Sequence, residues 1–166
     1  MTSNEVAVYI KSYLEGISGW VGKVYTHPLD IKEKDQLQQY AWVWDPSLER
    51  YITNCWFISR TAARPVRGGA QRGIPLMKGA FLETYTIDGW YDFYGWSGES
   101  ERAFQSLVDS VMDRLLPQIS IGQVSDEVTL LEINVPRIEL REFGPILCHH
   151  CQVTLTVEHV KSPSYA

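Results

Sequence analysis

The chain has 166 residues, of which 45% are hydrophobic and 21% charged, and a formal net charge of -5. This length and composition suit one globular domain that buries roughly 70% of its unfolded surface, while the acidic balance disfavours a general nucleic-acid-binding protein, which is normally basic. No apolar run approaches the length of a membrane span and the N-terminus lacks signal-peptide features, so we expect a protein made in the cytoplasm with no membrane partner.

The first predicted element is an N-terminal helix. Thr2 and Glu5 form a capping-box pattern, and apolar residues then recur at helical spacing: Val6, Tyr9, Ile10, Tyr13, Leu14 and Ile17. Gly16, Gly19 and Gly22 end this helix, and the proline after His27 imposes an extended or turn geometry on the chain that follows.

The next region contains the first predicted strands. Residues 30–48 give no clear pattern: Lys32 to Lys34 indicates a charged turn, and Ala41 to Trp44 a short strand. Arg50 to Thr61 is a stronger strand, apolar on both faces near its middle, which suits a central position in a sheet. Gly79 to Trp90, rich in Tyr, Thr and Phe, is a further strand.

The clearest periodicity predicts a second helix ahead of Pro117. Ser97 is its expected cap, and Glu99 and Glu101 lie in its first turn, where negative charge is favourable. Its apolar stripe consists of Phe104, Leu107, Val108, Val111, Met112 and Leu115.

Two strand regions close the chain, Glu127 to Arg141 and Leu147 to Val160, with a turn at residues 143–145. The last strand alternates, with the odd-numbered residues 147–157 on one face and the even-numbered residues 148–158 on the other. The order of elements predicts an α+β fold: a mostly antiparallel sheet with two amphipathic helices packed on it and a long arm between two strands. We expect one domain over residues 1–160 and a loose C-terminal tail over 161–166.

The segment that we call the basic arm, residues 60–79, reads RTAARPVRGGAQRGIPLMKG. So long a connection is uncommon in a compact domain unless it has a role. Three interpretations remain open: a solvated loop, an arm that contacts phosphates, and an arm that inserts between neighbouring subunits. Docking is favoured over DNA contact because cations facing the acidic surface of another copy fix the register between subunits. The candidate docking residues are Arg60, Arg64, Arg67, Arg72 and Lys78.

No cofactor, metal or enzymatic activity is expected from the motifs. Cys148, His149, His150 and Cys151 resemble a zinc site, but strand alternation directs them to opposite faces, so they cannot converge on one tetrahedral ion. The three cysteines, Cys55 included, are too few for a secreted disulfide framework, and we expect free thiols. The sequence contains no GxxxxGK loop, GxSxG elbow or HExxH pair.

An aromatic cluster follows the second arm-flanking strand. Such density can stack on bases or sugars, but Asp88 and Asp92 nearby argue against a single-stranded nucleic-acid site. We therefore interpret these residues as core and protein interface, because Tyr and Trp supply large contact areas at low entropic cost. The candidate interface aromatics are Trp90, Tyr91, Phe93, Tyr94 and Trp96.

The layout of the chain resembles the tail terminator proteins, also called tail completion proteins, of long-tailed bacteriophages. The resemblance spans about Ser3 to Val160 and includes an amphipathic N-terminal helix and two strands joined by a long arm. It continues with the helix introduced by SGESERAFQSLVDSVMDRL and the final strand ILCHHCQVTLTVEHV. The chain departs from the family pattern at residues 30–49 and 90–96, which correspond to no element of that layout.

The resemblance implies an α+β virion protein of the tail or neck that forms a homohexameric ring on the tail tube, stops tail growth and joins the DNA-filled head. It implies as partners other copies of the chain, the tail tube protein and a head-completion or connector protein, with double-stranded DNA passing through the ring. The arm would reach a neighbouring subunit or the tube, and the sheet near residues 147–158 would help to build the ring. Alternatives are another neck or head-completion adaptor, and a small ligand-binding module that uses the aromatic surface.

Overall fold

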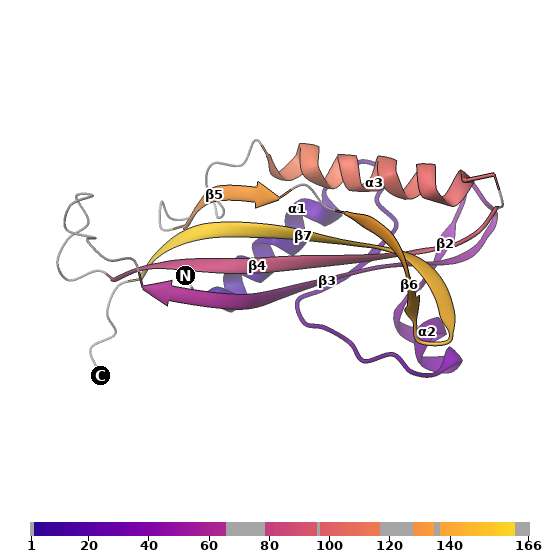
Figure 1. Cartoon of the computed structure of the whole chain (residues 1–166), viewed down its shortest axis with the longest axis horizontal. Coiled ribbons are helices and arrows are strands. Elements are labelled where there is room, and N and C mark those ends of the chain that lie inside the picture. The colour runs from indigo at the N-terminus through magenta and orange to yellow at the C-terminus, as the bar shows by residue number, and fades with distance from the viewer. Residues whose placement is uncertain (1, 66–78, 96, 117–127, 135–136, 162–166) are drawn as a thin grey trace.

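The computed structural model describes residues 2–65, 79–95, 97–116, 128–134 and 137–161. Within these ranges the chain forms three helices and a sheet of seven strands (Figure 1). The elements are α1 (Ser3–Glu15), β1 (Lys23–Tyr25), α2 (Lys34–Tyr40), β2 (Trp42–Asp45), β3 (Arg50–Pro65), β4 (Gly79–Asp92), α3 (Glu99–Leu115), β5 (Val128–Asn134), β6 (Ile138–Phe143) and β7 (Ile146–Lys161). None of the helices in the described part of the chain is long and apolar enough to cross a bilayer.

The sheet is mostly antiparallel, as predicted. Its strands follow the order β1-β3-β4-β7-β5, while β2 pairs with β3 and β6 pairs with β7. The pairing of β1 with β3 is parallel, and all other pairings are antiparallel. The long strands β3, β4 and β7 run side by side along the length of the molecule (Figure 1).

Helices α1 and α3 cover one face of the sheet. The Thr2 side chain accepts a hydrogen bond from the Glu5 backbone N–H, and the Glu5 carboxylate accepts one from the Thr2 backbone, which confirms the predicted capping box. The apolar stripes of both helices pack against β3, β4 and β7 in the larger core, which includes Ile10, Leu14, Phe104 and Val108. We call this side of the sheet the helical face.

A smaller core lies on the opposite face, at one end of the sheet. Leu37 of α2 and Ile31 of the preceding segment pack there against Phe57 of β3 and Phe143 of β6. Side chains on both faces of the sheet are therefore buried at this end, and Cys148, His149 and His150 are buried in succession. From Cys151 to His159 the predicted alternation of β7 holds, with the odd-numbered residues buried.

Several boundaries differ from the sequence-based expectation. Strand β3 runs to Pro65, four residues beyond its predicted end at Thr61 and into the arm, whereas β4 begins at Gly79 as predicted and ends at Asp92. The rest of the arm lies outside the described residues. Lys34 begins a third helix, α2, where we expected only a turn, and the predicted region 127–141 contains two strands, β5 and β6.

The cap of α3 also differs. Gly98, with φ 78°, is the N-cap, because the chain turns sharply from β4 into the helix through a left-handed conformation that glycine adopts without strain. The Ser97 hydroxyl instead donates a hydrogen bond of 3.0 Å to the Glu99 carboxylate. The acidic first turn, Glu99 and Glu101, is as predicted.

The helices of the helical face pack against the sheet at a contact between Trp56 and Gly89, which are paired across β3 and β4. The Trp56 ring is fully buried and lies over Gly89, where an added Cβ atom would come within 2.5 Å of it. Its centroid is 5.4 Å from that of Trp20 and 5.9 Å from that of Phe104, and its Nε1 donates a hydrogen bond of 2.9 Å to Asn54 Oδ1. Glycine at position 89 therefore makes room for the largest side chain of the core.

The half of the sheet that lies away from the smaller core has two edges that no described strand covers. Strands β1 and β2 pair with β3 only as far as Phe57, so the edge of β3 from Ile58 to Pro65 has no pairing partner among the described strands. On the other side of the sheet β5 is the last strand. We call this part, bounded by β3 residues 58–65 and by β5, the open half of the sheet.

Replacing Gly89 by alanine is expected to destabilise the fold by about 2 kcal/mol, because the new methyl group overlaps the Trp56 ring. Urea unfolding of Gly89→Ala, Trp56→Phe and the double variant measures this. The smaller phenylalanine ring should relieve the overlap, so the cost of Gly89→Ala should shrink in the Trp56→Phe background. Equal costs in both backgrounds would show that Trp56 does not constrain position 89.

Candidate functional site

The predicted docking residues of the arm fall into two groups. Arg60 and Arg64 lie near the end of β3, whereas Arg67, Arg72 and Lys78 lie outside the described residues. Arg60 and Arg64 differ in their surroundings, because a β-bulge between Arg60 and Ala62 shifts the register of β3 against β4. Arg60 is paired with Tyr85 of the helical face, and Arg64 is paired with Leu82.

Arg60 takes part in a polar cluster around a buried carboxylate. The Glu83 side chain is fully buried, and its Oε1 lies 3.4 Å from Arg60 Nη1. Ser3 donates a hydrogen bond of 2.9 Å to Oε1, Tyr85 donates one of 2.7 Å to Oε2, and His159 Nδ1 lies 3.3 Å from Oε2. Arg60 also donates a bond of 2.8 Å to Ser3. Burial and the neighbouring Glu83 raise the pKa of Tyr85, so this phenol stays a donor to the carboxylate.

This cluster ties the first turn of α1 to β3, β4 and β7, and it engages Arg60 within its own chain. Arg64, by contrast, is exposed and contacts no charged or polar side chain of the described residues. Of the two described arm arginines, Arg64 is therefore the one available to another molecule.

The predicted interface aromatics mostly contact residues of their own chain. Trp90 stacks on Phe143 with centroids 4.5 Å apart, and Tyr91 is buried and stacks on Phe104 at 5.6 Å. The hydroxyls of Tyr91 and Tyr94 lie 3.2 Å apart, and the Phe93 ring lies 5.5 Å from that of His149. Trp96 is not among the described residues. These contacts support the core part of the interpretation, and the interface part stays a prediction.

The cysteine and histidine run of β7 forms two separate environments. His149 faces α3 and lies 2.8 Å from Ser100 Oγ, whereas His150 faces away from it and lies 3.0 Å from Asp88 Oδ1. Cys55, Cys148 and Cys151 are free and fully buried, and burial raises the pKa of the Cys148 and Cys151 thiols to about 12. No group of three or more His, Cys, Asp or Glu side chains in the described ranges is arranged to hold a metal ion.

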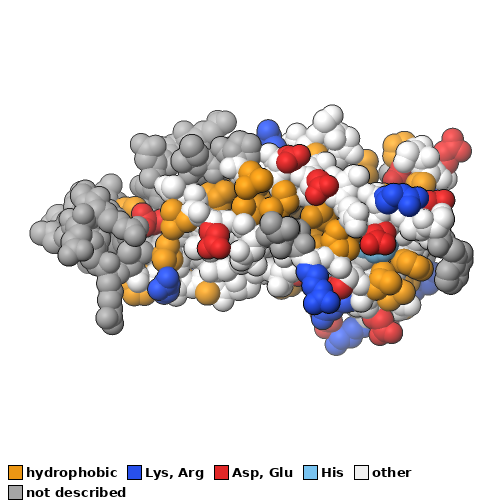
Figure 2. Space-filling model, turned by 45° about the horizontal axis from the view of Figure 1, so that its top comes forward, with side chains coloured by type: hydrophobic (Ala, Val, Ile, Leu, Met, Phe, Trp, Pro, Cys, Tyr) orange, Lys and Arg blue, Asp and Glu red, His pale blue; other side chains and the backbone are white. Residues whose placement is uncertain are grey.

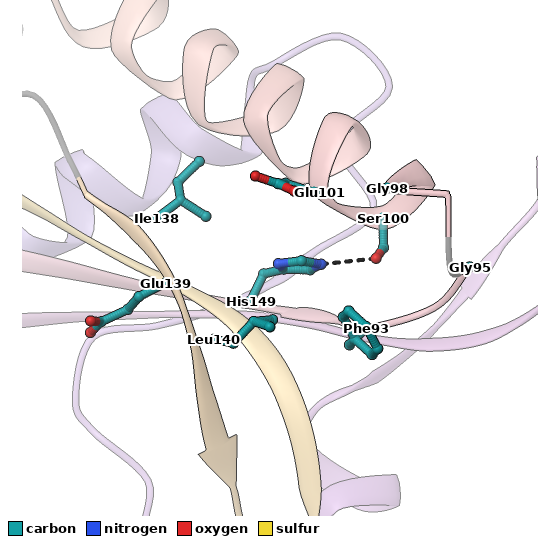
Figure 3. Close-up of a pocket in the computed structure, with 9 residues that line it drawn as sticks. All are labelled: Phe93, Gly95, Gly98, Ser100, Glu101, Ile138, Glu139, Leu140 and His149. Atoms are coloured by element: carbon teal, nitrogen blue, oxygen red, sulfur yellow. Dashed lines mark hydrogen bonds between the residues drawn. The ribbon is translucent and has the colours of Figure 1, made fainter.

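A pocket of about 290 Å³ lies between the start of α3, β6 and β7 (Figure 3). Phe93, Ile138 and Leu140 supply apolar surface, and Glu101 is an acidic residue at the start of α3, whereas the Glu139 carboxylate points away from the pocket toward His150. The His149 ring lies at the centre, with one nitrogen directed at Ser100 and the other away from it (Figure 3). Sequence analysis missed this pocket, because its residues come from four separate segments.

The pair of Ser100 and His149 has the spacing of a nucleophile and its base, but its surroundings favour a structural role. Ser100 is 1% exposed, and its hydroxyl already accepts a hydrogen bond of 3.1 Å from the Tyr94 backbone N–H. Among the described residues no carboxylate binds the second nitrogen of His149. Ser100 therefore joins the loop before α3 to the middle of the sheet.

No protein family model matches the chain, and no curated protein resembles it significantly in sequence. Interpretation of the site therefore depends on the geometry of the described residues and on the resemblance in layout.

Replacing Arg60 by glutamine is expected to destabilise the protein by about 2 kcal/mol, because the buried Glu83 carboxylate then loses its ion pair with Arg60. Arg64→Gln is the matched control in the same strand, and its effect should stay within about 0.5 kcal/mol, because its side chain is exposed. Urea unfolding of both variants makes the comparison. Equal losses would contradict the assignment of Arg60 to an intramolecular role.

His149 should make stability depend on pH. Burial lowers the pKa of its imidazole, and the charge of Glu101 opposes this shift only in part. Because the folded protein then binds fewer protons than the unfolded chain, the contribution of His149 is complete above the unfolded pKa of about 6.5 and is lost as the pH falls below it.

The difference in unfolding free energy between the wild type and His149→Gln should therefore decrease from pH 7 to pH 5. Taking the difference removes the contributions of the groups that are present in both proteins. A difference independent of pH would show that His149 does not titrate in this range.

Proposed function

We propose that this protein is a virion structural protein that forms a homohexameric ring at the end of a bacteriophage tail tube. There it stops tail growth and provides the surface to which the head is joined. Its partners are other copies of the chain, the tail tube protein and a head-completion or connector protein, with double-stranded DNA passing through the ring. On this proposal the protein acts by binding, without making or breaking a covalent bond.

The observation that carries the proposal is the open half of the sheet. Helices cover one of its faces, and no described helix covers the other, on which threonines lie in register: Thr84, Thr86, Thr154 and Thr156. Because this face offers few cations to the phosphate backbone, it suits a channel through which DNA passes without being held.

The charge distribution supports self-association. Residues 60–78 contain five cations and no acid, so the remaining residues carry 20 acids against 15 − 5 = 10 cations, a net charge of −10. The described strands place the start of this basic segment at one end of the long sheet (Figure 1). Opposite charges on different parts of one surface favour contacts in which each copy binds the next in the same orientation, as in a ring.

Native mass spectrometry of the purified protein over a wide concentration range tests the proposal. We expect hexamers, with a fraction that grows with protein concentration and falls with salt, because charge complementarity contributes to their formation. Electron microscopy of the same sample should show rings with a channel wide enough for double-stranded DNA. A monomer at every concentration, both alone and mixed with its tail tube, would contradict the proposal.

A further inference from the structure

The two edges of the open half lie level with one another. Reading across the sheet, Ala62 of β3 is paired with Thr84, Thr84 with Thr156, and Thr156 with Glu132 of β5. The edge of β3 and the edge of β5 therefore occupy the same position along the strand direction. They are also antiparallel to each other, because three antiparallel pairings separate them.

Identical molecules set side by side in the same orientation would therefore bring the β3 edge of one copy against the β5 edge of the next. The strands would meet in the antiparallel direction, which leaves their backbone groups suitably placed for a ladder of hydrogen bonds. The segment of β3 from Ile58 to Pro65 and the seven residues of β5 are similar in length. No change of fold is needed for the contact.

The side chains at the two edges complement each other. Arg64 and Glu132 are both exposed and both lie on the face away from α1 and α3, as their register partners Leu82 and Thr156 do. Arg64 is two register positions from Glu132, a diagonal separation that a long arginine side chain can span. Leu131, at the middle of the β5 edge, is 50% exposed. Figure 2, in which the upper side of Figure 1 is turned forward, shows acidic side chains beside apolar ones on this side of the molecule. A basic strand edge thus faces an edge that combines acidic and apolar side chains.

The β-bulges of the two edges also lie at similar positions along the strands. Thr61 is the extra residue of the β3 bulge, and Leu131 is the extra residue of the β5 bulge. Along the strand direction the two bulges are one residue position apart. Bulges at an edge disfavour pairing with an arbitrary strand. An interface between these edges places its irregular positions next to each other, which favours a second copy of the same chain over an unrelated strand.

We infer that the ring closes by strand addition, in which the β3 edge of each copy, residues 58–65, pairs with the β5 edge of the next and Arg64 binds Glu132 across the interface. The inference rests on the proposed function, to which it adds the surface that joins the subunits. Each copy uses one edge of each kind, so the contact is head-to-tail and the sheets of all copies form one continuous wall.

Engineered disulfides test the pairing. Ala62→Cys is combined with Glu132→Cys, which is level with it, or with Asn134→Cys, which faces it if the copies are shifted so that Arg64 lies directly opposite Glu132. Within one chain three strand spacings separate these positions, roughly 14 Å or more, which a disulfide cannot span. The native cysteines are fully buried, so any disulfide-linked oligomer reports a contact between copies.

At least one of the two pairs should give a ladder of covalent oligomers that ends at the hexamer on a non-reducing gel. The control combines Ala62→Cys with Ser12→Cys, an exposed position on α1, and should stay monomeric on the gel. Wild-type hexamers in native mass spectrometry together with no linkage above the control would overturn the strand pairing and leave the proposed function standing. The absence of any oligomer, wild type included and also with the tail tube added, would overturn both.

Charge exchange tests the side-chain contact. Arg64→Glu and Glu132→Arg should each weaken association at least tenfold, and the double variant should recover most of it, because the ion pair is restored with its partners exchanged. Lys32→Glu changes the charge by the same amount at an exposed position outside the open half and should leave association unchanged. Two single losses without recovery in the double variant would show that Arg64 and Glu132 do not bind each other.

Discussion

The packing of Trp56 on Gly89 is the contact on which the arrangement of the layers depends. Two adjacent strands meet there, one with the largest side chain of the core and the other with the smallest residue, so the indole lies close to the backbone of β4. From this position its ring reaches both Trp20, which follows α1, and Phe104 of α3. Trp56 therefore positions both helices against the sheet. Gly89 in turn determines how closely the indole ring of Trp56 packs on β4.

This anchoring divides the long sheet into two parts with different properties. Near β1, β2 and β6 both faces are covered, and the second core around Phe57 and Phe143 closes that end. Toward the ends of β3 and β7 only the helical face is covered, and there the charged groups are held individually, as the Glu83 cluster shows. The two ends of the strands thus differ: one end is covered on both faces, and the other presents two edges and a face lined with threonines.

The sequence predicted the elements whose signal is periodic. The stripes of α1 and α3 and the alternation of β7 each repeat over many residues, and all three were located to within a few positions. Helix α2 was missed because it has seven residues and one buried side chain, Leu37, too few to define a period. The extension of β3 from Ala62 to Pro65 was missed because these four residues are exposed and resemble a polar loop. The pocket near His149 and the matching of the two edges follow from strand register, which the sequence does not specify by itself.

The bulge in β3 has a consequence for every residue beyond it. In a regular strand all even-numbered residues share one side, so Arg64 would point the same way as Trp56, Ile58 and Arg60. The extra residue, Thr61, inverts this parity, and its hydroxyl lies 3.3 Å from both the Thr84 carbonyl oxygen and the Thr86 hydroxyl. A single extra residue thus moves the side chains of all following strand residues to the opposite faces of the sheet. Arg60 and Arg64 therefore lie on opposite faces of the sheet. Arg60 binds the buried Glu83 carboxylate of its own molecule, and Arg64 is exposed.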